Sequence, residues 1–486
     1  MIIWIDGANG VGKSHVAAKL EELLSNRNAE YIESDLYWVE LIQNNFLKAL
    51  NGFEPYNNKY CLETIRTVLE EKFQKHNKMP IISMSLVDKR CQEELLDYFE
   101  KKNVHIHLKS RAMKIIPEAK QVLIQDLDTQ RAYLVDYDKL IIAIGARPVI
   151  PKIKNVNLPN IFTLRKIEDG ITIKEKALKS KHATIVGAGY IGMEVLEALV
   201  KQNLKVTIVE YAPYVMTIFD EDMSRLIEEQ LNSINDGRFQ ILTSELVTEF
   251  SGDMNGVHTV RTGTGKEFNT DFVVLCAGVT PNVDIAKDAG IDIGLTGAIK
   301  VNEKMETNIP DIYACGDCVE EHLVVSGTKI WMPLGSNANK EGRTAAINAC
   351  GGDDKFIGVL GSAVTRCLNL TMSMTGLTEK RATALGYTPV SVTVTKNDKV
   401  GYMPNVNNIT LKLTADYETG KILGAQAVGA GDADKRINSL AAALLAGMTV
   451  EEFYNNDLTY APPFSPTIDP LLNAAQILMS KVKQKD

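Results

Sequence analysis

The sequence lacks several features that would place it in a special class of protein. Its 486 residues include only seven cysteines, an odd number scattered along the chain, so a disulfide framework is not expected. No apolar run approaches the roughly 18 residues that a membrane-spanning helix needs. The opening apolar stretch, Met1 to Ile5, is too short for a signal peptide and leads into a glycine motif. A cytoplasmic protein that does not enter a membrane is therefore expected.

Positive charge is also in short supply. Lys and Arg number 53 against 61 Asp and Glu, which gives a net charge of −8 and a pI near 5.6. Such a chain offers no basic face for nucleic acid or for an anionic membrane. Hydrophobic residues make up 45% of the chain, as in ordinary globular proteins, and its length predicts roughly three domains.

What is present is an alternation of predicted strands and helices, typical of parallel α/β folds. In the first 108 residues the predicted strands are Met1–Ile5, Glu30–Glu33, Met79–Met84 and Val104–Leu108, and the predicted helices include Lys13–Leu24 and Leu62–His76. Short strands follow in VLIQDL and YLVDYDKLIIAIGA. A second βαβ unit is predicted from His182 to about Asp288, followed by a helix at Asn337–Asn348. From about Lys355 the pattern becomes α+β, with strands in SVTVTK, ITLKLTAD and GKILGAQAVG and a helix at Lys435–Gly447.

The first glycine motif, GANGVGKS, runs from Gly7 to Ser14 and fits the pattern GxxxxGKS between an apolar strand and a helix. Glycines such as Gly7 and Gly12 let backbone N–H groups curl around phosphate oxygens, and the helix N-terminus adds partial positive charge. Lys13 would reach the β- and γ-phosphates, while Ser14 would ligate Mg²⁺. Mg-ATP or Mg-GTP is the expected ligand. The plainer alternative is a glycine-rich turn that only mimics the pattern.

With this loop, and with YIESDLYW and MPIISMSLVD at the next strands, residues 1–108 resemble P-loop kinase-like ATPases related to the tunicamycin resistance protein. The resemblance implies that Asp35 and Asp88 lie near substrate and magnesium, although each could equally cap a helix or lie in a turn. It ends near Ser110, before the basic lid of that family. Phosphate binding is therefore expected, whereas phosphoryl transfer is not.

The second glycine motif is GAGYIG, in which Gly187, Gly189 and Gly192 follow the predicted strand HATIV and open a helix. The next strand, KVTIVE, ends in Glu210, 23 residues beyond Gly187, where an acid can accept hydrogen bonds from the ribose hydroxyls of a dinucleotide. That acid disfavours a 2′-phosphate, so NADH is expected in preference to NADPH. A Rossmann-like turn that binds no dinucleotide is the alternative.

Further motifs stand in order along the chain: YDKLIIAIGARPVIP, CAGVTPN, TNIPDIYACGDCVE, PLGSNANKEGR and YAPPFSPTIDP. From about Ala112 to the end, the chain resembles the pyridine nucleotide-disulfide oxidoreductases, in the branch of coenzyme A-disulfide reductases and NADH oxidases. The expected fold is α/β, a P-loop parallel sheet module fused to an FAD/NAD(P) Rossmann-type reductase body with an α+β C-terminal dimerisation domain. The expected domains are a truncated P-loop module (1–108), a partial FAD-binding domain (109–175), an NAD(P)-binding domain (176–288), the continued FAD-binding domain (289–354) and the dimerisation domain (355–486).

The resemblance implies roles for particular residues. Asp317, after Gly316, would accept a hydrogen bond from the ribityl chain of FAD, and Gly278 would belong to the cofactor-binding set. Tyr190 would cover the flavin and swing aside for nicotinamide, and Tyr460 would reach the active site of the partner in a homodimer. The alternatives are a solvated aspartate in a turn and aromatic side chains that only pack.

The same resemblance also shows what is missing. Members of this family begin with their own GxGxxG for the FAD pyrophosphate, followed by a redox cysteine in a segment like SFxNCGxPYY, and neither appears before Ala112. Cys61 and Cys91 stand in polar, helix-like surroundings. Cys315 and Cys318 have the CxxC spacing of dithiol redox centres, yet they flank the flavin motif, so a redox role for this pair is the less favoured interpretation.

These observations predict an NADH- and FAD-dependent oxidoreductase of the disulfide-reductase class, with a small disulfide or oxygen as acceptor. Its activity is expected to be weak because the N-terminal FAD segment and the redox cysteine are absent. An ATP- or GTP-binding kinase-like protein with an inert reductase body is the alternative from another class, and a nucleotide-binding scaffold without turnover is a third.

Overall fold

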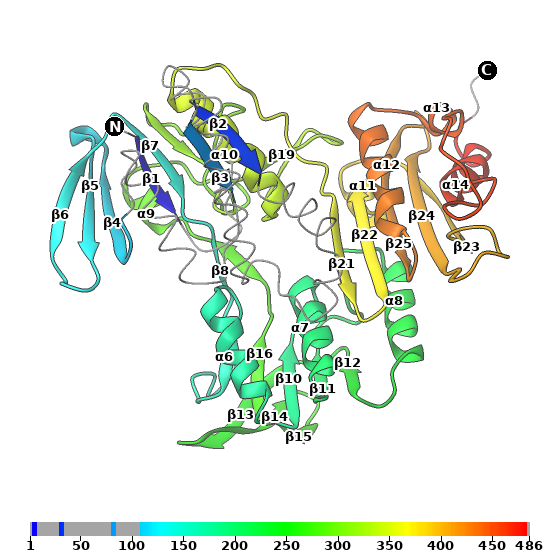
Figure 1. Ribbon diagram of the computed structural model, residues 1–486, viewed down its shortest axis with the longest axis horizontal. Coiled ribbons are helices and arrows are strands. Elements are labelled where there is room, and N and C mark those ends of the chain that lie inside the picture. Colours follow the sequence, from blue (N-terminus) through cyan, green and yellow to red (C-terminus); the bar gives the residue numbers. More distant parts are fainter. Residues whose placement is uncertain (1, 7–28, 34–78, 84–106, 484–486) are drawn as a thin grey trace. The chain divides into compact units, whose positions relative to one another are not determined.

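The computed structural model describes residues 2–6, 29–33, 79–83 and 107–483, which divide into two compact units (Figure 1). The first unit takes in the described parts of Met1–Ala146, Pro281–Glu321 and Lys329–Ile357, and the second takes in those of Arg147–Thr280, His322–Thr328 and Gly358–Asp486. Four short strands lie where the chain passes between the units: β8 (Ala146–Pro148), β17 (Val279–Pro281), β19 (Glu321–Leu323) and β20 (Thr328–Ile330).

The first unit is centred on a parallel sheet in which β7 (Lys139–Ala143) lies between β1 (Ile2–Asp6) and β18 (Ile312–Ala314). Leu140 to Ala143 are all buried, as expected for a central parallel strand covered on both faces. Ile142 pairs with Ile5 on one side and with Ala314 on the other, so the three carboxyl ends share one edge. Helix α10 (Gly335–Ala349) packs against β7 and β18 through a face made largely of alanine.

Smaller elements complete the first unit. An antiparallel sheet contains β4 (Ser110–Ile116), β5 (Gln121–Asp126) and β6 (Ala132–Asp136), with the 3₁₀ turn η3 (Pro117–Ala119) between its first two strands. Helix α9 (Asp284–Asp288) packs against β4. The strands β2 (Ala29–Glu33) and β3 (Met79–Ser83) pair in parallel with each other.

The second unit begins with a five-stranded parallel sheet in the order β12-β11-β10-β16-β9. Its strands are β9 (Ile161–Thr163), β10 (His182–Val186), β11 (Lys205–Val209), β12 (Phe239–Leu242) and β16 (Phe272–Leu275), and its helices are α6 (Ile167–Ala177), α7 (Tyr190–Lys201) and α8 (Glu221–Ser233). The central strand β10 is apolar from Ala183 to Val186, with Ile185 fully buried beneath α7. An antiparallel sheet of β13 (Val247–Asp253), β14 (Gly256–Thr262) and β15 (Glu267–Asn269) is attached to it.

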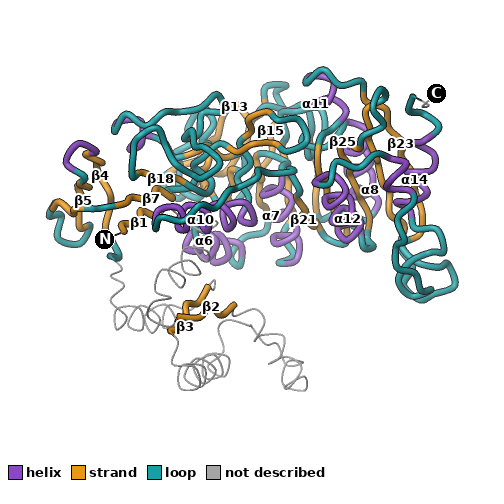
Figure 2. The backbone as a smooth tube through the Cα atoms, turned by 90° about the horizontal axis from the view of Figure 1, so that it is seen from above, coloured by secondary structure: helices purple, strands orange, loops and turns teal. Residues whose placement is uncertain are grey.

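The rest of the second unit is a five-stranded antiparallel sheet in the order β21-β22-β25-β24-β23. Its strands are β21 (Ala363–Cys367), β22 (Leu370–Gly376), β23 (Pro389–Asn397), β24 (Asn408–Asp416) and β25 (Ile422–Gly429), and its helices are α11 (Glu379–Ala384), α12 (Ala433–Leu445), α13 (Val450–Tyr454) and α14 (Pro470–Met479). Helices α12 and α14 pack against this sheet and share one apolar core with it (Figure 2).

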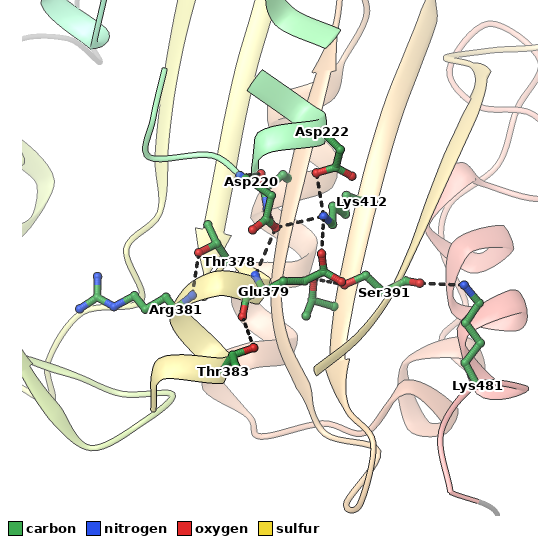
Figure 3. Close-up of polar contacts among 11 residues, drawn as sticks. Asp220, Asp222, Thr378, Glu379, Arg381, Thr383, Ser391, Lys412 and Lys481 are labelled. Carbon is green, nitrogen blue, oxygen red and sulfur yellow. Dashed lines mark hydrogen bonds and ion pairs between the residues drawn. The ribbon is translucent and has the colours of Figure 1, made fainter. Parts of the chain in front are cut away.

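A buried lysine joins the two halves of the second unit. The Lys412 ammonium on β24 lies 2.8 Å from Asp222 at the start of α8, 3.2 Å from Asp220 before it and 2.7 Å from Glu379 on α11 (Figure 3). Asp220 also accepts a hydrogen bond from the side-chain amide of Gln426 on β25 at 2.6 Å. The side chain of Lys412 is 4% exposed. Ion pairs and a hydrogen bond therefore connect the parallel-sheet half to the antiparallel-sheet half.

Most elements predicted in the described part are confirmed. The βαβ unit at His182, the long helix at Asn337–Asn348, the three C-terminal strands and the helix at Lys435–Gly447 are all present, with ends shifted by a few residues. Three of the four N-terminal strands are also present, as β1, β2 and β3. Residues 107 and 108, the described end of the predicted strand Val104–Leu108, are not in a strand, and the helices Lys13–Leu24 and Leu62–His76 fall outside the described residues. Within the described part, no helix is long and apolar enough to cross a membrane.

Candidate nucleotide-binding sites

The glycine turn between β10 and α7 has a different steric requirement at each glycine. Gly187 takes a φ of +106°, and a Cβ there would lie 2.3 Å from the carbonyl oxygen of Cys276. A Cβ at Gly192 would lie 2.1 Å from the carbonyl oxygen of Gly187, because the first turn of α7 packs directly on the loop. A Cβ at Gly189 would meet nothing within 4 Å. Two glycines are therefore required by packing, while the third leaves open space where a ligand can approach the backbone.

Glu210 lies beside this turn, immediately after β11. Its carboxylate accepts hydrogen bonds from the backbone N–H groups of Ala188 at 2.6 Å and Ala212 at 2.8 Å. The predicted acid is thus held against the glycine turn at the carboxyl edge of the sheet, where doubly wound folds bind nucleotides. Gly278, which follows β16 at the same edge, has a φ of +98° and open space on its Cβ side.

Tyr190 is the first residue of α7, directly after Gly189. Its ring packs against the apolar core of the parallel-sheet half, and its hydroxyl oxygen is buried without a hydrogen-bond partner among the described residues. Burial raises the pKa of this phenol above its ordinary value. A buried hydroxyl without a partner is unusual in proteins and is a common sign of a side chain that moves or meets a ligand.

The second candidate site lies in the first unit, at the carboxyl end of β18. Gly316 takes a φ of +78°, and Asp317 is 5% exposed. The indole N–H of Trp331 donates to the backbone oxygen of Asp317 at 2.9 Å, and the backbone N–H of Met332 donates to the carboxylate of Glu321 at 2.8 Å. These two contacts fix the approach to α10 against the turn that carries Asp317.

The first turn of α10 is open on the side of the helix start. No side chain caps it at Leu334, and a Cβ at Gly335 would meet nothing within 4 Å. Below the turn, the carboxylate of Glu341 on α10 accepts a hydrogen bond from the N–H of Gly316 at 2.7 Å and is fully buried. Its other oxygen has no hydrogen-bond partner among the described residues.

Sequence reasoning assigned no role to Glu341, Glu321 or Trp331, although the first lies in the quoted motif PLGSNANKEGR. Helical periodicity was the available signal for Glu341. Ala338, Glu341 and Ala345 recur at intervals of three and four residues, which places the carboxyl group on the same face as the alanines that pack on the sheet. A glutamate within such an apolar stripe must be paired or protonated.

The CxxC pair is buried. Cys315 and Cys318 are both fully buried and remain thiols, and the Cys318 thiol donates to the backbone oxygen of Cys315 at 3.2 Å. Burial raises the pKa of Cys318 to about 12, and it raises those of Cys276 and Cys367 to about 12 as well. Because the thiolate is the reactive form, these three thiols are poor redox nucleophiles.

The remaining predicted residues are placed as follows. Tyr460 lies in the segment between α13 and α14 and is half exposed. Gly7, Gly12, Lys13 and Ser14 lie outside the described residues, as do Asp35, Asp88, Cys61 and Cys91. The strand that precedes the GxxxxGKS motif is described, however, and it ends at the same sheet edge as β7 and β18.

The comparisons with known proteins address the same two regions. The family described as "Pyridine nucleotide-disulphide oxidoreductase" matches residues 59–342, and its dimerisation domain matches residues 363–471. This chain belongs to the pyridine nucleotide-disulphide oxidoreductase family. The NAD(P)H sulfur oxidoreductase (CoA-dependent) of Pyrococcus furiosus is 36% identical over 395 residues, covering 80% of this chain and 87% of that protein.

Other relatives point the same way. An NADH oxidase of Methanocaldococcus jannaschii is 34% identical over 393 residues, which covers 80% of this chain and 86% of that protein. The solved structure of an NAD-dependent persulfide reductase from A. fulgidus aligns with a TM-score of 0.82 at 30% identity, covering 99% of this chain and 83% of that one. The chain is therefore an oxidoreductase of this family, with an α/β reductase body and a C-terminal dimerisation domain. The family match begins at residue 59, inside the predicted P-loop module, which stays a prediction.

Proposed function

We propose that this protein is an FAD-containing oxidoreductase that takes a hydride from NADH and passes electrons to oxygen or to a small disulfide or persulfide. The observation that carries the proposal is the turn of Gly187, Gly189 and Gly192 with Glu210 held against it. Its family membership and the names of its relatives support the reaction class.

The second unit supplies the residues for NADH. The open side of Gly189 would let the pyrophosphate approach the backbone N–H groups at the start of α7, where the helix dipole favours negative charge. Glu210 would orient the adenosine ribose by accepting from its hydroxyl groups. The same carboxylate would repel a 2′-phosphate, so we propose a preference for NADH over NADPH.

The first unit supplies the residues for FAD, and the structure there fits such a group. A turn with positive φ at Gly316, the uncapped start of α10 and the orphaned oxygen of Glu341 all lie at one sheet edge. Asp317 would hold the ribityl chain, and Tyr190 would exclude water until nicotinamide binds. When bound, FAD supplies the chemistry that accepts a hydride and releases electrons to the acceptor.

The acceptor follows from the cysteines. Attack on a disulfide needs a thiolate, and burial holds Cys276, Cys318 and Cys367 in the thiol form. We therefore propose that oxygen is reduced faster than coenzyme A disulfide, and that disulfide reduction is weak. The dimerisation domain supports a homodimer, in which we propose that Tyr460 contributes to the partner's site.

The test is anaerobic stopped-flow mixing of the full-length, FAD-reconstituted protein with NADH, followed by addition of an acceptor. We expect the yellow flavin absorbance to bleach on mixing and to return faster with oxygen than with coenzyme A disulfide. A protein that never acquires flavin absorbance would contradict the proposal. Rapid reoxidation by the disulfide would overturn the choice of acceptor and would direct attention to Cys61 and Cys91.

A second candidate function, nucleoside triphosphate binding, is favoured by one specific observation. The GxxxxGKS motif directly follows β1, whose carboxyl end lies beside that of β7 at the ligand edge of the first unit. We propose that Gly7 to Ser14 bind Mg-ATP or Mg-GTP without efficient phosphoryl transfer. Titration of the full-length protein with Mg-ATP tests this function separately from the flavin chemistry.

A further inference from the structure

Two buried glutamates lie beneath the turn that carries Asp317, and the mechanism above gives them no part. Glu341 projects from α10 and is fully buried, while Glu321, at the start of β19, is 5% exposed. Each accepts one backbone hydrogen bond, from Gly316 at 2.7 Å and from Met332 at 2.8 Å respectively. Both therefore touch the segments that frame the proposed flavin site.

No cation balances this pair within the described part of the chain. None of the ion pairs there joins Glu321 or Glu341 to a lysine or arginine. The titratable groups that act on the pair are Asp317 and Cys318, from the turn after β18. Burial raises the pKa of both glutamates, and the charge of Asp317 raises them further. One oxygen of Glu341 also lacks a partner, so the site has room for a proton.

We propose that Glu341 is a positioning residue that holds the Gly316–Asp317 turn for FAD, and that proton binding by the Glu341–Glu321 pair is coupled to FAD binding. This inference rests on the proposed function, because it needs FAD at this turn. The Glu341 carboxyl group fixes the N–H of Gly316 and thereby sets the direction of Asp317. Loss of the shared proton places a second negative charge beneath Asp317, which opposes binding of an anionic dinucleotide.

The first measurement is the affinity of the full-length protein for FAD, from flavin fluorescence, between pH 7 and pH 9.5. For the wild type we expect roughly tenfold weaker binding at the upper end, because the pair loses a proton in this range. Glu341→Gln keeps an oxygen that accepts from Gly316 but cannot ionise, so its affinity should change by no more than about twofold. Glu341→Leu removes the acceptor, and FAD should bind weakly at every pH.

The second measurement needs no flavin. A carboxyl group whose pKa is raised in the folded state holds a proton that the unfolded chain has already lost above about pH 4.5. Folded-state stability therefore falls as pH rises from there through the folded pKa. In thermal unfolding of the apoprotein, Glu341→Gln should show a shallower fall, gaining roughly 2–4 °C on the wild type between pH 6 and pH 8. Glu321→Gln should behave alike, and it serves if the first variant does not fold.

Glu320→Gln is the matched control. Glu320 is also buried in this turn, but its carboxylate accepts a hydrogen bond from the Thr296 hydroxyl at 3.1 Å. Its pH profiles should follow the wild type. If the wild type binds no FAD, the proposed function fails, while the unfolding profiles still test the shared proton. If Glu341→Gln and the wild type have the same pH dependence in both measurements, the inference is wrong.

Discussion

At the residue scale, Gly189 offers the sharpest test of the NADH site, because only a ligand requires it to be glycine. Its Cβ side is open, so Gly189→Val should fold normally while its side chain occupies the space needed by the pyrophosphate. We expect NADH to bind at least about 100-fold more weakly, since each charged hydrogen bond to the phosphates contributes about 1.5–3 kcal/mol. Titration calorimetry measures the loss.

Two other glycines serve as controls for that variant. In Gly263→Val the new Cβ would lie 3.7 Å from its neighbours, an ordinary contact on the β14–β15 hairpin, so NADH affinity should not change. Gly187→Val should instead lower the yield of folded protein, because its Cβ would clash with the Cys276 carbonyl. Unchanged NADH binding by Gly189→Val would show that the dinucleotide does not use this turn.

Glu210 carries the choice between NADH and NADPH. Glu210→Gln keeps an oxygen that can accept from the N–H of Ala188 but removes the charge that repels a 2′-phosphate. We expect the preference for NADH to narrow by roughly tenfold, mainly through tighter NADPH binding. Glu210→Ala also releases the N–H groups of Ala188 and Ala212, so it should weaken both dinucleotides. Equal discrimination in the wild type and in Glu210→Gln would contradict this role.

The contrast between Gly187 and Glu341 shows which residues a sequence can reveal. Gly187 was predictable because a short motif fixes its backbone geometry, and the structure confirms the positive φ. The role of Glu341 depends on a neighbour 25 positions away, Gly316, which only the packing of α10 on β18 brings within hydrogen-bond distance. Local patterns give local geometry, whereas partners across elements come from the tertiary structure.

At the scale of secondary-structure elements, Lys412 is the test of how α8 and α11 are held on the antiparallel sheet. Lys412→Met would leave the carboxylates of Asp220, Asp222 and Glu379 without their shared cation (Figure 3). We expect a loss of about 3 kcal/mol in unfolding free energy, since breaking a buried ion pair leaves charges uncompensated. Lys435→Met, which removes an exposed pair with Asp432, should change it by less than about 1 kcal/mol. Denaturant titration compares the two variants.

The same network has a defined pH dependence. Burial lowers the pKa of Lys412, but hydrogen bonds to Asp222 and Glu379 outweigh it and raise the pKa overall. A lysine whose pKa is raised on folding adds stability that is fully present below its unfolded value, about 10.4, and that disappears as pH rises through the folded value. The difference between the wild type and Lys412→Met should therefore be constant near neutral pH and shrink in strongly alkaline solution.

Elements with strong periodicity were predictable, and their partners were not. SVTVTK and ITLKLTAD alternate or are apolar enough to indicate strands, and they form β23 and β24. Their place beside β25 in the order β21-β22-β25-β24-β23 depends on long-range pairing, which no local pattern contains. The ends of α10 and α12 shift by one to two residues from the predicted bounds, since helix ends are set by tertiary contacts as well as by sequence.

At the scale of the whole molecule, the two units divide the two nucleotide sites between them. The Gly187 turn belongs to the second unit and the Gly316 turn to the first. The sequence predicted both sites and the family, and it predicted a break in family resemblance before Ala112. The family match instead starts at residue 59, and the persulfide reductase structure aligns with 99% of the chain. Motif-based reasoning finds a family where its short signatures survive, whereas whole-chain comparison also detects similarity between signatures.

Lys13 tests what the N-terminal segment binds within this arrangement. The parallel pairing of Ile5 with Ile142 brings β1 to the ligand edge of the first unit, so the GxxxxGKS motif begins where the family binds a nucleotide. If the motif binds a triphosphate, Lys13→Ala should weaken Mg-ATP binding at least about tenfold by removing the cation that reaches the β- and γ-phosphates. NADH affinity should not change, because the Gly187 turn lies in the other unit. Parallel titrations of the wild type and Lys13→Ala with Mg-ATP, FAD and NADH measure this. A loss confined to FAD would contradict triphosphate binding and would give the motif to the flavin pyrophosphate instead.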